Sequence, residues 1–98
     1  MAKYFLTNLA VEDLTEIWNY TYDNWSEEQA DHYYEQLINA FELITNNPSK
    51  GKSYEGIANN LLGFKVNRHI IFYRVVNPEQ LEITRILHEQ MDLERRIQ

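Results

Sequence analysis

Arg85-Ile-Leu-His-Glu-Gln-Met-Asp-Leu93 is the stretch that decides the fold, because it follows two strand-like runs and a polar turn. The runs are Gly63–Asn67 and His69–Val76, and the turn is Asn77–Gln80. Apolar runs of this length separated by turn residues are typical of strands at hairpin spacing. The second half of the chain therefore predicts an antiparallel meander of three strands. These strands are expected near 62–67, 68–76 and 81–88.

The first half predicts one short strand and a helical hairpin. Lys3–Thr7 is expected to be the strand, and apolar residues then repeat at helical spacing over Leu9–Asn24. Ser26-Glu-Glu-Gln29 has the pattern of a capping box, so a second helix begins there and runs to about Asn46. Pro48 disfavours helix in the residue before it. Because the link between the helices is short, they should lie antiparallel.

The first predicted helix carries two apolar stripes, and either Thr7 or Asn8 can cap its start. We expect one stripe to face the core, and its members are Ala10, Leu14, Ile17 and Thr21. The other stripe either packs on the second helix or waits for a partner, and its members are Val11, Trp18, Tyr22 and Trp25.

These elements predict one α+β domain over residues 1–98. An N-terminal strand is followed by an α-helical hairpin packed on one face of an antiparallel β-sheet, and a short C-terminal tail ends the chain. The middle run, 68–76, is apolar on both faces, as in a strand covered on both sides. Residues 49–60 form the one long loop, and residues 92–98 either form a last helical turn or fray.

Charge is split between the two halves. The net charge of −6 comes from a balance of −8 over residues 1–49 and +2 over residues 50–98. An acidic chain is a poor general ligand of nucleic acid, since neutralised phosphates supply most non-specific affinity. We therefore expect no direct sequence-specific binding of nucleic acid. The basic sheet half should instead attract an acidic segment of a partner.

The composition also indicates the cellular compartment of the protein. The chain has no cysteine, which excludes a disulfide framework and fits a reducing cytoplasm. Its longest strongly apolar run, Ile70–Tyr73, is far too short to span a membrane. We expect a cytoplasmic protein without a membrane partner.

The residues give little sign of a metal, a cofactor or covalent catalysis. His32, His69 and His88 lie on different predicted elements without a ligand spacing, so no metal site is expected. Gly51-Lys-Ser53 resembles the end of a phosphate-binding loop but lacks its earlier glycine and preceding strand. No serine stands in the setting of an activated nucleophile. We predict no catalytic residue and no cofactor.

Ribonuclease chemistry is the enzymatic alternative, since it needs a base, an acid and cations at the phosphate. Strand alternation separates the candidates, because Arg68 and Arg74 share one face while His69 and Tyr73 point the other way. The full set of candidates is Lys50, Lys52, Glu55, Arg68, His69, Tyr73, Arg74, Arg85 and His88.

Aromatic residues are the strongest sign of protein binding. Five of them exceed what a thin two-layer fold can bury, namely Trp18, Tyr22, Trp25, Tyr33 and Tyr34. Large aromatics anchor interfaces by filling desolvated pockets. The alternative for each one is packing in the core or within the hairpin.

The chain resembles the RelE/ParE toxin superfamily, and most closely its ParE-like branch. The resemblance rests on the order of elements and on Leu62-Gly-Phe64, His69–Arg74, and Ile86-Leu-His88 followed by Met91-Asp92. It implies a toxin of a type II toxin–antitoxin system, a plasmid stabilisation protein that inhibits DNA gyrase by binding it and traps the cleaved enzyme–DNA complex. It further implies a ParD-like antitoxin that wraps the toxin in a heterotetramer.

Two rival functions accompany the resemblance. The RelE-like branch cleaves mRNA on the ribosome and places an aromatic residue or histidine near the position of His88. The acidic charge and the continuation Glu89–Asp92 depart from that branch. The other rival is a toxin fold that has lost toxicity and serves only as an interaction partner.

The resemblance and the residues together assign two surfaces. The antitoxin should lay an amphipathic helix on the five aromatics named above. Target binding and toxicity are assigned to Arg68, Arg74, Arg85, His88, Met91 and Asp92.

Overall fold

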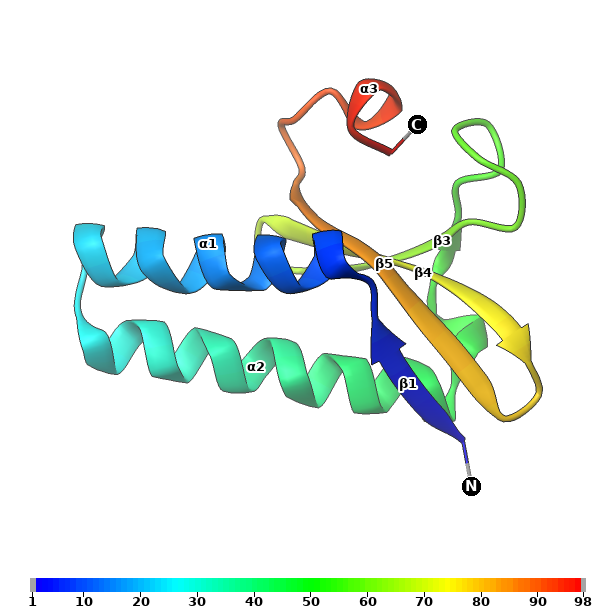
Figure 1. The fold of residues 1–98 in the computed structure, drawn as a ribbon, viewed down its shortest axis with the longest axis horizontal. Coiled ribbons are helices and arrows are strands. Elements are labelled where there is room, and N and C mark those ends of the chain that lie inside the picture. Colours follow the sequence, from blue (N-terminus) through cyan, green and yellow to red (C-terminus); the bar gives the residue numbers. More distant parts are fainter. Residues whose placement is uncertain (1, 98) are drawn as a thin grey trace.

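Two antiparallel helices lie against one face of a five-stranded sheet in the computed structural model, which describes residues 2–97 (Figure 1). The predicted α+β class, helical hairpin and three-stranded meander are confirmed. The elements in chain order are β1 (Lys3–Leu6), α1 (Asn8–Asn24), α2 (Glu27–Asn46), the 3₁₀ turn η1 (Pro48–Lys50), β2 (Lys52–Ser53), β3 (Leu62–Val66), β4 (His69–Asn77), β5 (Gln80–His88) and α3 (Leu93–Ile97).

The strand order in the sheet is β1-β5-β4-β3-β2. β2 to β5 pair antiparallel, as the meander predicted, but β1 pairs parallel to β5 from Lys3 opposite Gln80 to Leu6 opposite Ile83. The prediction of an antiparallel sheet therefore missed one parallel pairing, and it placed the short β2 in a loop. Residue periodicity identifies a strand but does not identify its neighbour.

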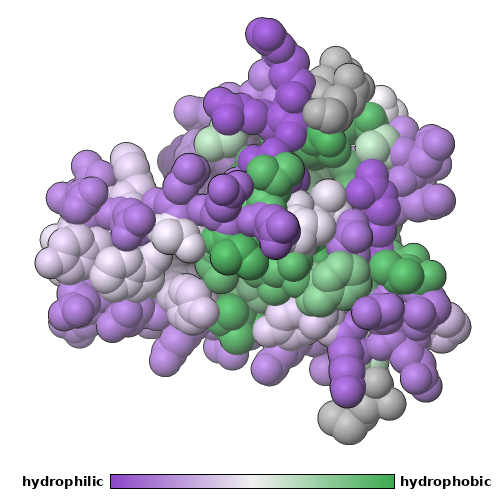
Figure 2. Space-filling model, in the orientation of Figure 1, coloured by the Kyte–Doolittle hydropathy of each residue, from purple (hydrophilic) through white to green (hydrophobic). Residues whose placement is uncertain are grey.

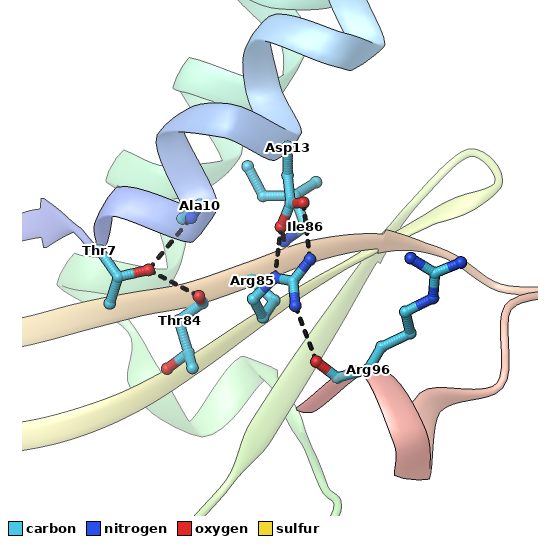
Figure 3. Close-up of polar contacts among 7 residues, drawn as sticks. All are labelled: Thr7, Ala10, Asp13, Thr84, Arg85, Ile86 and Arg96. Carbon is cyan, nitrogen blue, oxygen red and sulfur yellow. Dashed lines mark hydrogen bonds and ion pairs between the residues drawn. The ribbon is translucent and has the colours of Figure 1, made fainter. Parts of the chain in front are cut away.

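Thr7 holds the start of α1 on the sheet. Its Oγ1 accepts a hydrogen bond from the N–H of Ala10 at 3.1 Å and donates one to the carbonyl of Thr84 at 2.8 Å (Figure 3). The N–H of Thr7 donates to the carbonyl of Ile83. Of the two predicted caps, Thr7 is the one that caps the helix, and it also fixes the helix to β5.

Replacing Thr7 with alanine is expected to lower the free energy of unfolding by about 1–3 kcal/mol, because the cap and a second hydrogen bond are both lost. Thr7→Ser keeps the oxygen and should lose much less. Thr15→Ala is a matched control, since that hydroxyl is exposed and bonds only within its own helix. Urea denaturation measures all three, and equal losses for Thr7→Ala and Thr15→Ala would contradict this role.

Two apolar cores lie on opposite faces of the sheet. The hairpin covers the larger core, which includes Leu37, Phe41 and Ile83. The smaller core covers the other face, and its buried members are Leu61, Ile70, Phe72 and Leu87. Both α3 and the loop that precedes β3 pack against this smaller core. β4 was predicted to be covered on both faces. The loop before β3 and the C-terminal α3 cover its second face, and neither segment was predicted to do so.

Candidate functional site

A cavity of about 480 Å³ opens between α1 and the C-terminal end of β5. It exists because the hairpin extends beyond the end of the sheet, so the last turns of α1 have no strand beneath them (Figure 1). The α1 residues that line it recur at helical spacing and therefore share one face. The lining residues are Asp13, Glu16, Ile17, Tyr20, Thr21, His69, Ile86, His88 and Met91.

Asp13, one of the lining residues, forms a nearly buried ion pair with Arg85. Arg85 Nε lies 2.8 Å from Asp13 Oδ2, and Arg85 Nη2 lies 2.9 Å from Asp13 Oδ1. The N–H of Ile86 donates to the same carboxylate at 3.0 Å, and Arg85 Nη1 donates to the carbonyl of Arg96 (Figure 3). The hydrogen bonds with Asp13 raise the pKa of Arg85 above its ordinary value. Arg85 thus joins α1, β5 and α3.

Tyr33, His69 and His88 form a chain of contacts from α2 to the tail. Tyr33 Oη donates to the carbonyl of Val66 at 3.0 Å and lies 2.8 Å from His69 Nδ1, so the imidazole N–H donates to the phenol. The rings of His69 and His88 meet edge to face at 5.3 Å between centroids. His88 Nδ1 in turn accepts from the N–H of Gln90.

Burial keeps the inner part of this chain uncharged. It raises the pKa of Tyr33 to about 12. Burial, with a smaller contribution from the neighbouring His88, lowers the pKa of His69 to about 4. Both groups are neutral at pH 7, so His69 supplies no positive charge there for a phosphate.

Acid is expected to destabilise the protein through His69. Its folded-state pKa of about 4 lies below the ordinary value of 6.5, so the unfolded chain binds the proton more tightly. The free energy of unfolding should fall as the pH drops from about 6.5 to about 4. At higher pH the imidazole is neutral in both states, so it should cause no loss of stability. His69→Gln should show a smaller fall than the parent in urea denaturation. His32→Gln, on the exposed face of α2, is the control and should keep the parental slope.

The predicted antitoxin-binding aromatics differ in what they already contact. Trp25 is 74% exposed, and Tyr22 and Tyr34 are also exposed. Trp18 is half-buried, stacks on Tyr22 at 5.2 Å and donates from Nε1 to Asp31 of α2. Tyr33 is half-buried between α2 and the sheet. The second stripe of α1 therefore packs partly on α2 and partly remains open.

The hairpin and β1 carry further exposed apolar side chains. In Figure 2 hydrophobic side chains gather over the middle of the hairpin and along β1, while the far end of the hairpin is pale or hydrophilic. The exposed aliphatic and phenylalanine side chains of β1, α1 and α2 are Phe5, Leu9, Val11 and Leu43. This apolar surface supplements the predicted aromatic one.

The structure splits the predicted target-binding residues into groups. His88 and Met91 line the cavity, and Arg85 is paired with Asp13, which also lines it. Arg74 is remote from them, since it donates to the carbonyl of Asn59 and lies 3.9 Å from Glu82. Arg68 is exposed in the β3–β4 turn, and Asp92 is exposed just before α3.

Of the ribonuclease candidates, His69 and His88 meet edge to face, whereas most of the others lie on different faces and edges of the sheet. His69 and Tyr73 face the hairpin side, where Tyr73 belongs to the larger core, whereas Phe72 and Ile70 belong to the smaller core on the other face. This alternation is as predicted. Lys50 and Lys52 belong to η1 and the edge strand β2, at the opposite side of the sheet from β1.

Several cavity residues were not predicted as functional. No sequence pattern assigned a role to Asp13 or Glu16, yet Asp13 pairs with Arg85 and both residues line the cavity. The spacing of residues 13, 16, 17, 20 and 21 predicts that they share one face of a helix. It does not predict that this face contacts residues about 70 positions later in the sequence.

Within residues 2–97, no group of three or more His, Cys, Asp or Glu side chains could hold a metal ion. No helix there is both long and apolar enough to cross a bilayer.

Comparison with known proteins decides the family. Residues 4–93 match the family described as the ParE toxin of type II toxin–antitoxin system, parDE. The chain belongs to the ParE toxin family. It is therefore a ParE-type toxin of a type II toxin–antitoxin system, and the predicted resemblance is confirmed.

Relatives of known name agree with this ParE assignment. Toxin ParE1 of Mycobacterium tuberculosis strain H37Rv is 32% identical over 96 residues, which is 98% of each chain. Toxin ParE1 of Caulobacter vibrioides is 34% identical over 92 residues, which is 94% of each chain. A chain from a solved structure of the chromosomal ParDE TA system from P. aeruginosa superposes with a TM-score of 0.77. It covers 90% of this chain and 96% of that one at 16% identity, which supports the fold.

Proposed function

We propose that this ParE toxin inhibits DNA gyrase by protein–protein binding in the cytoplasm and is neutralised by a ParD-like antitoxin. The observation that carries the proposal is the ParE family match over residues 4–93. Most ribonuclease candidates are scattered over different faces and edges of the sheet, and His69, which meets His88, is neutral at pH 7. This arrangement supports a binding mechanism without chemistry of its own.

For the target-binding surface we propose the tail and its surroundings. His88, Met91 and Asp92 are accessible to a partner, and Arg68 is exposed beside them, since its carbonyl accepts from the N–H of Glu89. Arg74 and Arg85 were proposed for the same surface, but both already bond within the chain. Their contribution to toxicity is therefore expected to be mainly through the positions of their neighbours.

For the antitoxin we propose the aromatic surface of the hairpin and a heterotetramer built on an antitoxin dimer. Trp25, Tyr22 and Tyr34 are the most exposed of the five aromatics, so they are the expected anchors. Trp25→Ala or Tyr22→Ala should weaken the complex by about 1–3 kcal/mol. Trp18 and Tyr33 have internal partners, and their replacement should affect stability as well as binding.

A supercoiling and cleavage assay with folded, antitoxin-free protein tests the gyrase proposal. We expect loss of supercoiling with accumulation of linear DNA, and a weaker effect for Met91→Asp, which alters an exposed tail residue. Val76→Asp, at an exposed site on β4, is the matched control. Intact supercoiling from a folded sample in excess would reject the gyrase target.

The rival functions give different results in parallel assays. Cleavage of mRNA in a translating extract, with intact supercoiling, would establish the RelE-like alternative. Normal growth on expression without an antitoxin would indicate a toxin fold that has lost toxicity.

A further inference from the structure

The cavity between α1 and the end of β5 is an open apolar hollow in the free protein. Ile17 and Ile86 contribute its apolar wall, and Ile86 is almost fully buried. Tyr20 and Met91 stand at its rim, with 67% and 39% of their surfaces exposed. A concave site with apolar walls and exposed aromatic and methionine side chains is suited to one large side chain of a partner.

On its α1 side, the charged residues of this hollow are acidic. Asp13 is neutralised by Arg85, but Glu16 and the adjacent Glu12 are exposed and form no ion pair within residues 2–97. Both lie close enough to Arg85 to raise its pKa. None of the nine lining residues is lysine or arginine, and His69 is neutral at pH 7.

The end of α1 adds to this negative potential. A helix C-terminus carries a partial negative charge, which a basic residue in the last turn would offset. The last turn of α1 has no basic residue, and Thr21 in that turn lines the cavity. The helix end therefore favours a cation near the apolar hollow.

We propose that this hollow binds one apolar side chain of a basic amphipathic helix from a protein partner, with a lysine or arginine of that helix paired to Glu16. For the partner's identity the inference rests on the proposed function, in which the antitoxin supplies this helix. Such a segment is opposite in charge to the acidic one expected on the sheet half. It would contact α1 together with His88 and Met91, so it would cover part of the surface assigned to the target.

A pair of synthetic peptides tests the chemistry of the site. One is an amphipathic helix of leucine and lysine, and the other has glutamate in place of lysine. We expect the Leu/Lys peptide to bind the full chain and to shift the amide resonances of Ile17, Thr21 and His88. The Leu/Glu peptide should bind far more weakly. Equal binding of both peptides, or shifts elsewhere on the chain, would overturn the proposal.

Matched charge reversals separate this site from the overall negative charge. Glu16→Lys should weaken binding of the Leu/Lys peptide by more than about tenfold. Glu35→Lys makes the same change in net charge at an exposed α2 position outside the cavity, and it should change affinity by no more than about twofold. Circular dichroism confirms that both variants fold. Equal losses for the two variants would reject the docking site.

The docking site and the proposed function can fail separately. Gyrase inhibition without peptide binding at the cavity would reject the docking site and leave the proposed function. Peptide binding at the cavity without growth arrest or gyrase inhibition would reject the proposed function and leave the site.

Discussion

Asp13→Ala is expected to lower the free energy of unfolding by about 3–5 kcal/mol, because it leaves Arg85 with an uncompensated charge in a nearly buried position. The side chains of Asp13 and Arg85 are only 8% and 13% exposed. The same substitution removes the acceptor of the Ile86 N–H. This N–H lies beyond the part of β5 that pairs with β1, since that pairing ends at Ile83. Chemical denaturation measures the loss.

Two variants show whether the ion pair is the cause. Glu12→Ala removes the neighbouring exposed carboxylate and should change stability by no more than about 0.5 kcal/mol. The double variant Asp13→Leu with Arg85→Met buries no charge, so it should recover much of the loss. Recovery should be incomplete, since the Ile86 N–H still lacks its acceptor. A loss for Asp13→Ala no larger than that for Glu12→Ala would refute the role of the pair.

Phe72→Ala should also cost about 3–5 kcal/mol, because it opens a cavity in the smaller core. Phe72 is fully buried, and its ring meets that of Tyr54 edge to face at 5.1 Å. The loop and α3 depend on this core for their packing. Hydrogen exchange should therefore accelerate more at residues 54–61 and 93–97 than in the hairpin.

Val76→Ala is the control for this variant, since Val76 lies on the same strand but is 53% exposed. It should change stability by no more than about 0.5 kcal/mol. Uniform acceleration of exchange across hairpin and tail in Phe72→Ala would show that the two faces of the sheet unfold as one unit.

Local patterns predicted most of the fold. Ser26 caps α2 through the N–H of Gln29, as its capping box indicated, and the spacing of Leu37, Phe41 and Ile44 placed one face of α2 in the core. Such signals depend on neighbours a few residues apart. The parallel pairing of β1 with β5 depends on residues far apart in the sequence, and no local pattern encodes it.

The candidate site was less predictable for the same reason. His88 and Met91 were assigned a function from the tail, and exposed Trp25 was recognised from its type and position. Arg85 was assigned to target binding, whereas its guanidinium is paired with a carboxylate on α1, 72 residues earlier in the sequence. The cavity has walls from both ends of the chain, so only the assembled fold reveals it.

The position of β5 in the sheet has a consequence for synthesis of the toxin. β1 and α1 are translated before β5, the strand on which they pack. Contacts between distant segments form only after both segments are available. The β1–β5 pairing, the Asp13–Arg85 pair and the cavity therefore cannot assemble before β5 has left the ribosome.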